Sequence, residues 1–212
     1  MITRRIFIAA AALLAFAGWA TAPVPASADP RSESAARFVQ DLGARAVDIL
    51  ITPDLQRQEV ENRFRTLLNE GFDVPYIGRF VLGRNWNTAT PEQRQEYLEL
   101  FERLIVKVYA DRFSEYSGQS LDSGETLKIL GHRPEGERDA IVQSQIVRPD
   151  GPPVTVEWRV RQRDGQNKII DVAVEGVSMS VTQRNEFASV IQRGGGSIDA
   201  LLNALRQRTA AR

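Results

Sequence analysis

A serine nucleophile is the first chemistry that the residue spacing suggests, in the stretch G-V-S-M-S at 176–180. A nucleophile elbow requires the pattern G-x-S-x-G, and here a serine replaces the second glycine. Any serine triad would also need His132, the single histidine, as its base. His132 stands beside Arg133 at an expected strand end. We therefore predict a surface or lightly packed histidine, and a turn in which Ser180 caps a helix.

A carboxylate pair and a glycine run are two further candidates. Asp171 and Glu175 share one face of an expected strand, but four residues at about 3.3 Å each separate them by about 13 Å. Paired glycosidase carboxylates lie roughly 5 to 9.5 Å apart. The glycine triplet 194–196 lacks the lysine that follows in a P-loop, so we interpret it as a corner between helices. With no HExxH, EF-hand or CxxC pattern, we predict no catalytic residue, no metal site and no cofactor, and a protein that is not an enzyme.

Charge and cysteine content narrow the classes of function. The 212 residues include 27 Lys and Arg, 27 Asp and Glu, and no Cys. A nucleic-acid binder needs clustered excess basic residues, so we expect no nucleic-acid partner. Without cysteine, disulfides, zinc ribbons and thiol nucleophiles are excluded, and a packed core must stabilise the fold.

The first 28 residues have the pattern of a signal peptide. A basic start at Arg4 and Arg5 precedes an apolar run of about 15 residues, too short to span a bilayer, and A-S-A at 26–28 is a cleavage pattern. Removing two basic residues leaves 25 against 27 acidic ones, with about 38% hydrophobic residues. We predict export to the periplasm with cleavage near Ala28, by a general secretory or a twin-arginine route.

Helix patterns dominate residues 29–118. Ser32 is an expected N-cap for a helix to about Leu50, and a second helix is expected from Thr52-Pro53 to Gly71. A short helix follows from Asp73 to Gly83. The longest is expected from the capping box T-P-E-Q at 90–93 to about Tyr116, and its centre is apolar nearly all round.

The spacing of apolar residues changes from a helical period of 3.6 toward the strand period of 2 over about residues 125–175. Val154, Val156, Trp158 and Val160 alternate with polar residues, and turn residues separate this strand from candidates at 126–132, 140–147 and 168–174. Helices return over 180–208, with S-V-T-Q at 180–183 as a second capping box. The order predicts an α+β domain over 29–212, in which helices pack on an antiparallel, curved sheet of about four strands. The apolar faces fit either a filled core or an apolar pocket, and both alternatives stay open.

Several blocks of the sequence resemble the MlaC family, also called the toluene-tolerance family. The first are D-V-P-Y-I-G-R-F-V-L-G-R-N-W at 73–86, T-P-E-Q-R at 90–94 and the stretch 97–109. The later ones are D-V-A-V-E-G-V-S-M at 171–179, R-N-E-F at 184–187 and G-G-S-I-D-A-L-L at 195–202. The blocks follow in family order over nearly the whole mature chain.

The resemblance implies a periplasmic phospholipid carrier with an NTF2-like cone around an apolar cavity. Its ligand would be a glycerophospholipid, and its partners an inner-membrane MCE-domain/ABC transporter and an outer-membrane lipoprotein–porin complex; we expect a monomer. The residues expected to line or border the acyl cavity are Ile77, Val81, Trp86, Tyr97, Phe101, Leu104, Val108, Trp158, Val174, Val177, Met179, Phe187 and Ile191. Arg79, Arg84 and Arg112 are weaker candidates for head-group or partner contacts, with solvated surface arginines as the alternative.

Two alternatives remain on the residues alone. One is an NTF2-like enzyme for a small molecule, which would need a carboxylate or histidine inside the pocket; we expect none there. The other is a periplasmic interaction module without a ligand, whose interior would lack an apolar void on the order of 300 Å³.

Overall fold

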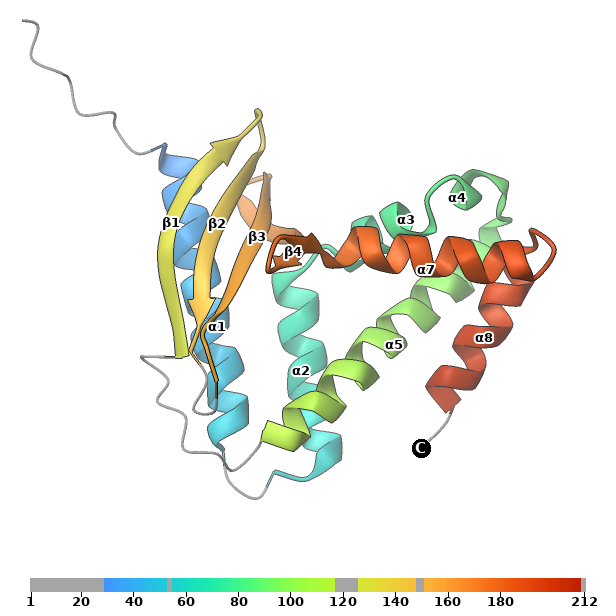
Figure 1. Ribbon diagram of the computed structural model, residues 1–212, viewed down its shortest axis with the longest axis horizontal. Helices are drawn as coiled ribbons and strands as arrows, with labels where there is room; N and C mark the ends of the chain where they lie inside the picture. The colour runs from blue at the N-terminus through green and yellow to red at the C-terminus, as the bar shows by residue number, and fades with distance from the viewer. Residues whose placement is uncertain (1–28, 53–54, 117–125, 148–150, 211–212) are drawn as a thin grey trace, which may run out of the picture.

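The computed structural model describes residues 29–52, 55–116, 126–147 and 151–210, without the side chains of 111–116. The predicted signal peptide lies outside this part of the chain. The elements, in order, are α1 (Pro30–Ile51), α2 (Arg57–Gly71), α3 (Val74–Leu82), α4 (Asn85–Thr88), α5 (Pro91–Tyr116), β1 (Leu127–Glu135), β2 (Asp139–Ile146), β3 (Val154–Arg163), β4 (Gln166–Val174), β5 (Val177–Ser178), α7 (Met179–Arg193) and α8 (Ile198–Ala210). This order confirms the predicted α+β class (Figure 1).

Several helix ends follow from the predicted caps. In the capping box before α5, the Gln93 backbone N–H donates to Thr90 Oγ1 at 3.2 Å, and the Thr90 N–H donates to Gln93 Oε1 at 3.0 Å. Asp73 caps α3 by accepting from the Tyr76 N–H at 3.1 Å. Gly83 ends that helix at φ 59°, a conformation that side chains disfavour. These caps place α3 and α5 where the sequence predicts them.

Other predicted starts are wrong. Asp29, not Ser32, caps α1, because its carboxylate accepts from the Arg31 N–H, and the Ser32 hydroxyl donates back to the Asp29 carbonyl. Ser178, not Ser180, caps α7 by accepting from the Val181 N–H at 3.1 Å. The helix expected from Thr52-Pro53 begins only at Arg57, and Pro53 lies outside the described residues. Serines two residues apart offer equivalent capping oxygens, so the pattern does not select between them.

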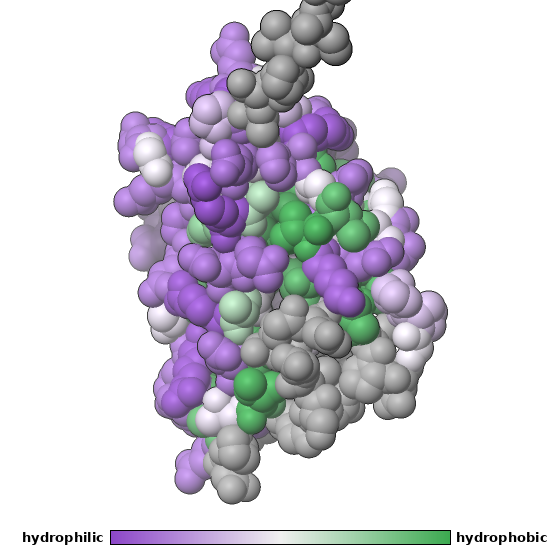
Figure 2. Space-filling view, turned by 90° about the vertical axis from the view of Figure 1, so that its left-hand side faces the viewer, coloured by the Kyte–Doolittle hydropathy of each residue, from purple (hydrophilic) through white to green (hydrophobic). Residues whose placement is uncertain are grey.

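The sheet is antiparallel, with strand order β1-β2-β3-β4-β5. The predicted four strands are present, and the two-residue β5 adds a fifth. The sheet curves on one side of the molecule, with α1 against it and the other helices beyond (Figure 1). Figure 2 shows that the surface on the sheet's side is mainly hydrophilic, with a smaller apolar area. No helix of the described part is both long and apolar enough for a membrane crossing.

Buried side chains form two cores. The helical core consists of Phe64, Leu68, Val74, Val81, Leu82, Tyr97, Leu100, Phe101, Leu104, Val106, Phe187, Ile191, Leu201, Leu202 and Leu205. The sheet core consists of Ala35, Val39, Leu42, Ile49, Val60, Leu67, Leu127, Ala140, Val142, Val160 and Ile169. Phe72 packs against both, and the next backbone N–H, of Asp73, donates to the Ile169 carbonyl at 3.0 Å. This segment therefore joins the helical part to β4.

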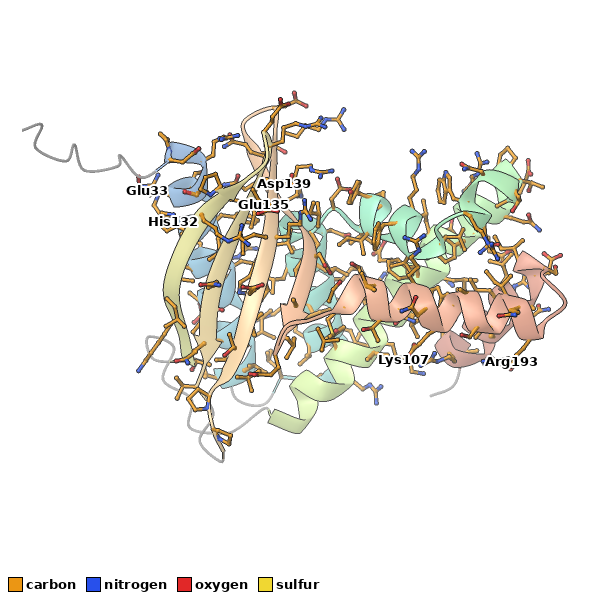
Figure 3. The ribbon with its side chains drawn as sticks, turned by 45° about the horizontal axis from the view of Figure 1, so that its top comes forward. Glu33, Lys107, His132, Glu135, Asp139 and Arg193 are labelled. Atoms are coloured by element: carbon orange, nitrogen blue, oxygen red, sulfur yellow. The ribbon has the colours of Figure 1, made fainter. Side chains whose placement is uncertain are left out.

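A cluster of charged side chains joins β2 and β3 to each other and to α3. Arg161 Nε and Arg159 Nε donate to the Asp139 carboxylate at 2.7 and 2.9 Å. The Arg161 guanidinium also lies 4.7 Å from the Tyr76 ring centroid of α3. Figure 3 shows Asp139, Glu135 and His132 at one end of the sheet, away from Lys107 and Arg193 in the helical part. His132 is half-buried, with Nδ1 3.0 Å from Ser32 Oγ, as a lightly packed histidine is expected to be.

Candidate functional site

A cavity of about 680 Å³ lies between the two cores. Its walls come from α1, α2, α3, α5, the strands and the start of α7. The residues that line it are Val39, Leu42, Gly43, Ala46, Val47, Leu50, Phe64, Leu67, Leu68, Phe72, Val74, Ile77, Val81, Phe101, Ile105, Tyr109, Thr126, Leu127, Ile146, Val147, Val154, Val156, Trp158, Asp171, Val172, Val174, Met179, Ser180 and Gln183. The volume exceeds the void expected of a filled interior, so the ligand-free module with a filled core is not the structure that forms.

The wall stays apolar because its few polar atoms are bonded within the protein. Trp158 Nε1 donates to Ser144 Oγ at 2.8 Å, and that hydroxyl donates to the Val156 carbonyl at 3.2 Å. The indole thus presents carbon to the cavity. On α5 and α2, the rings of Tyr109 and Phe64 stack at 6.1 Å. Tyr109 is 37% exposed, so the wall reaches the molecular surface near this residue.

One carboxylate lies in the wall, which corrects the expectation that none would. Asp171 Oδ2 accepts from Ser178 Oγ at 2.6 Å, and Oδ1 accepts from the Ser180 N–H at 3.2 Å and the Val172 N–H at 2.9 Å. The strand pattern did not show this, because the contacts depend on where α7 begins. Three donors hold the carboxylate and tie β4 to the first turn of α7, which gives Asp171 a structural role.

Six of the thirteen predicted cavity residues line the cavity. Ile77 and Val81 reach it from α3, and Phe101 from α5. Trp158 and Val174 contribute from β3 and β4, and Met179 from the first residue of α7. Strand alternation and the apolar face of the short helix were therefore sufficient to find this part of the wall.

The other seven lie outside the lining. Tyr97, Leu104, Phe187 and Ile191 are buried in the helical core, and Trp86 and Val108 pack against it half-buried. Val177 is 54% exposed in the short β5. Of the residues expected from α5, only Phe101 lines the cavity, because Tyr97 and Leu104 pack in the helical core.

Around Tyr97 the helical core is tightly filled. The Tyr97 ring lies 5.7 Å from the Phe101 ring and 6.2 Å from the Phe187 ring, and its hydroxyl donates to the Gly78 carbonyl at 3.0 Å. Burial raises the pKa of the Tyr97 hydroxyl far above its usual range. A neutral, hydrogen-bonded phenol is a packing element, so Tyr97 has no part in the cavity's polarity.

The two predicted arginines whose side chains the structure describes, Arg79 and Arg84, are not in the lining. Arg79 is exposed on α3, with its guanidinium carbon 5.8 Å from the Trp86 ring centroid. Arg84 is exposed at the start of α4. Arg112 belongs to α5, and its side chain lies outside the described residues. None of the described arginines contacts the cavity.

Sequence reasoning missed the share of the wall that α1 and α2 contribute. Leu42 and Ala46 of α1, and Phe64, Leu67 and Leu68 of α2, line the cavity. Their apolar stripes at helical spacing were visible in the sequence. A stripe shows that a face is buried, but it does not show whether that face meets side chains or a void.

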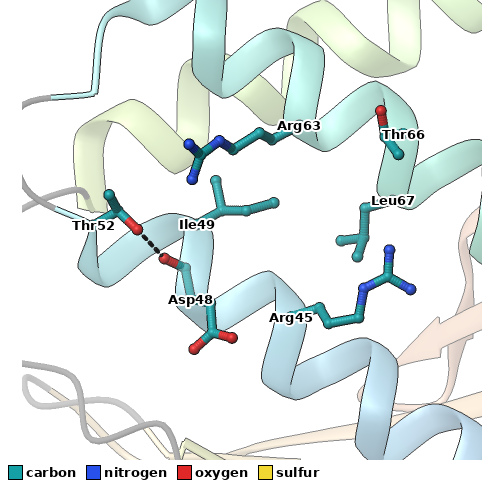
Figure 4. A pocket seen from close by; sticks show the side chains of 7 residues that line it. All are labelled: Arg45, Asp48, Ile49, Thr52, Arg63, Thr66 and Leu67. Carbon is teal, nitrogen blue, oxygen red and sulfur yellow. Dashed lines mark hydrogen bonds between the residues drawn. The ribbon is translucent and has the colours of Figure 1, made fainter.

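A second, smaller pocket of about 320 Å³ lies between α1 and α2 (Figure 4). Its lining is polar at the rim, where Thr52 Oγ1 donates to the Asp48 carbonyl at 2.6 Å. The two arginines of its rim are paired, Arg45 with Glu70 and Arg63 with Glu59. With its cations neutralised, this pocket offers less for a ligand than the main cavity.

Comparisons with known proteins agree on one family. The sequence model of the MlaC protein family matches residues 40–207. An intermembrane phospholipid transport system binding protein, MlaC, of Haemophilus influenzae is 26% identical over 179 residues, which cover 82% of this chain and 78% of that protein. The toluene tolerance protein ttg2D of Pseudomonas putida is 27% identical over 115 residues, covering 54% of this chain and about half of that protein.

A solved structure has the same fold. The phospholipid-binding protein of Ralstonia solanacearum, crystallised with a phospholipid, matches with a TM-score of 0.72 and 27% identity. The match covers 83% of this chain and 97% of that structure. The family match covers well over half of the sequence, and the structural match covers both the helices and the sheet. The chain therefore belongs to the MlaC family.

Proposed function

We propose that this protein is a lipid carrier that holds a glycerophospholipid by its acyl chains in the 680 Å³ cavity. The cavity is the observation that carries the proposal, because its lining is almost entirely aliphatic and aromatic. Among the described lining residues the only charged side chain is Asp171, which three donors already occupy. Hydrophobic contact and shape would do the binding, with the head group outside the apolar wall.

The energetics suit carriage rather than permanent storage. Each buried methylene is worth about 0.8 kcal/mol against water, so two chains of about 15 methylenes would contribute roughly 24 kcal/mol. That value is beyond the practical limit of about 21 kcal/mol for non-covalent binding. A bilayer buries the same chains, however, so exchange between bilayer and cavity lies near zero net free energy. The protein has only to shield the chains in transit.

The route of the lipid is part of the same proposal. After export and cleavage near Ala28, a periplasmic monomer would exchange lipid with an outer-membrane lipoprotein–porin complex and with an inner-membrane MCE-domain/ABC transporter. The name of one relative, an intermembrane phospholipid transport system binding protein, supports transfer of phospholipid between membranes.

Native mass spectrometry tests the proposal directly. Protein purified gently from a Gram-negative host should carry phospholipid, and a clean lipid-free mass would contradict the proposal. Ala46→Trp places an indole into the cavity from α1. Overpacking by about 1–3 kcal/mol should lower lipid occupancy roughly ten- to hundredfold. Ala188→Trp, at an exposed site on α7, adds the same side chain outside the cavity and should leave occupancy unchanged.

A further inference from the structure

Most arginines of the described chain are neutralised by a carboxylate. Arg37 pairs with Glu33 at 2.8 Å on α1, and Arg206 of α8 pairs with Glu96 of α5 at 2.6 Å. The ion pairs extend over α1, α2, the sheet and α8. In a chain with 27 basic and 27 acidic residues, this is the expected surface. A group of arginines without such partners is therefore an exception.

Eight described arginines form no ion pair with any carboxylate in the described part of the chain, and four of them lie around the turn between α3 and α4. We call Arg79, Arg84, Arg94 and Arg184 the arginine surface. The other four lie elsewhere in the chain, and none of them lies over an aromatic ring of the described residues: Arg103, Arg138, Arg193 and Arg208. Glu186, the acid nearest in sequence to Arg184, accepts from Gln183 at 3.0 Å instead. The surface thus keeps its positive charge.

Aromatic rings hold three of these guanidinium groups in place. Arg79 and Arg94 lie 5.8 and 5.4 Å from the Trp86 ring centroid. Arg94 also donates to the Trp86 carbonyl at 2.8 Å and the Asn87 carbonyl at 3.3 Å. Arg184 of α7 lies 5.3 Å from the Phe80 ring centroid. Side chains that are already ordered lose less entropy on binding, which favours recognition by this surface.

From this charge and order, we propose that the arginine surface is the docking site for an acidic face of a partner protein. Guanidinium groups match carboxylates in bidentate pairs, and arginine and aromatic residues are enriched in protein interfaces. Of the large exposed apolar residues of the described chain, Tyr76 of α3 and Val181 of α7 share a helix with an arginine of this surface. Two such side chains beside four guanidinium groups make a charged surface and not an amphipathic face for insertion into a bilayer, so we assign the partner as a protein.

The surface is also connected to the cavity. Arg79 stands on the solvent side of α3, and Ile77 and Val81 of the same helix line the cavity. α7, which bears Arg184, contributes Met179, Ser180 and Gln183 to the lining. A partner docked here would contact two of the helices that form the wall. The inference stands without lipid binding, since charge and order alone carry it.

Photocrosslinking in the producing cell tests the docking site. A photoreactive amino acid replaces Asn87, an exposed residue of α4, and in a matched control it replaces Gln58, an exposed residue of α2. We expect a protein adduct at position 87 and not at 58, with acidic residues in the crosslinked peptide of the partner. Arg79→Glu with Arg84→Glu should lower the adduct yield about tenfold. Arg37→Glu, on α1, should leave the yield unchanged.

Three results would overturn the proposal. The first is an equal yield at positions 87 and 58. The second is an adduct that survives the double charge reversal in a protein whose thermal unfolding is unaltered. The third is flotation with phosphatidylglycerol vesicles that depends on Arg79 and Arg84, which would assign the surface to a membrane. Restoration of the adduct by a reciprocal Glu→Arg change in the crosslinked partner would establish the pairing of charges.

Discussion

Helix α5 borders two regions of opposite character. In the helical core, the rings of Tyr97, Phe101 and Phe187 pack with centroids 5.7–6.2 Å apart. At the cavity, the same helix contributes Phe101, Ile105 and Tyr109 to the lining. Apolar residues at helical spacing serve both regions. The difference arises from what they meet: side chains of α7 and α8 pack against the residues in the core, while Ile105 and Tyr109 face the void.

This difference shows how one small domain can contain a large apolar cavity and remain stable. A cavity forfeits the contacts that its lining would otherwise make, so stability must come from elsewhere. Here the filled helical core and the fastening of the sheet at Phe72 and Asp139 supply it. We infer that truncating a buried side chain costs more stability in the filled helical core than in the wall of the cavity.

The largest expected difference is between two neighbours on α5. Leu104 is 5% exposed in the helical core, and Ile105 lines the cavity. Leu104→Ala creates a new void and should lower the free energy of unfolding by about 3 kcal/mol. Ile105→Ala enlarges an existing void, so in delipidated protein it should cost only about 1 kcal/mol. Urea unfolding measures both values.

The same pair distinguishes stability from binding. Added phospholipid should raise the unfolding midpoint of the Leu104→Ala variant as much as that of the wild type, because Leu104 does not line the cavity. The Ile105→Ala variant should gain less, since it has lost contacts with the acyl chains. Equal costs and equal gains for the two variants would show that α5 has no such division.

Two glycines provide the next comparison. A methyl group on Gly78 of α3 would lie 2.8 Å from Leu98 Cδ2 and 3.1 Å from Phe101 Cδ1, and the Phe101 ring is held by its neighbours. Gly78→Ala should therefore destabilise by about 1–3 kcal/mol. A methyl group on Gly43 of α1 would overlap Leu127 Cδ2, but that side chain can rotate into the cavity.

Gly43→Ala should accordingly stay within about 1 kcal/mol of the wild type, because the gain in helix propensity offsets the rotation of Leu127. It should still reduce lipid content, since the Leu127 side chain then occupies cavity space. Thermal unfolding of both variants and native mass spectrometry of Gly43→Ala measure these effects. A Gly43→Ala variant that is as unstable as Gly78→Ala would mean that the wall near Leu127 is as tightly packed as the helical core.

The sequence predicted the elements well wherever local chemistry decides them. The capping box at Thr90, the Asp73 cap and the stop at Gly83 depend on contacts within four residues, and strand alternation in 154–160 follows from one buried face. The choice between Ser178 and Ser180 as a cap depends on Asp171, which holds both residues from β4. Such a contact joins segments that no local pattern connects.

The cavity was only half predictable for a related reason. Burial determines the residue types of a wall and of a core alike, so Val174 in the cavity wall and Leu104 in the core are both aliphatic. The distance between the sheet and the helices decides which is which, and it depends on the packing of the whole domain. The wall of α1 and α2 could not be recognised before that distance was known.

The smallest expected effect concerns the joint between the regions. Asp139 is buried at 6% side-chain exposure, which opposes its ionisation, but hydrogen bonds from Arg161 and Arg159 outweigh this and hold its pKa below the usual range. Since Arg161 also covers Tyr76 of α3, the cluster ties the sheet to the helical part. Asp139→Asn should cost about 1–2 kcal/mol near neutral pH.

The pH dependence of that cost tests the charge itself. Because the pKa of Asp139 is lower in the folded protein than the value of about 3.9 in the unfolded chain, its contribution is complete above that value and declines as the pH falls below it. The difference in unfolding free energy between wild type and Asp139→Asn should therefore be largest near neutral pH and narrow below about pH 4. A constant difference across this range would show that the cost comes from packing and not from the charge of Asp139. If Asp139→Asn lowered the lipid content without changing stability, the charged cluster would act on the cavity itself, and the division between a stabilising region and a lipid-binding region would be wrong.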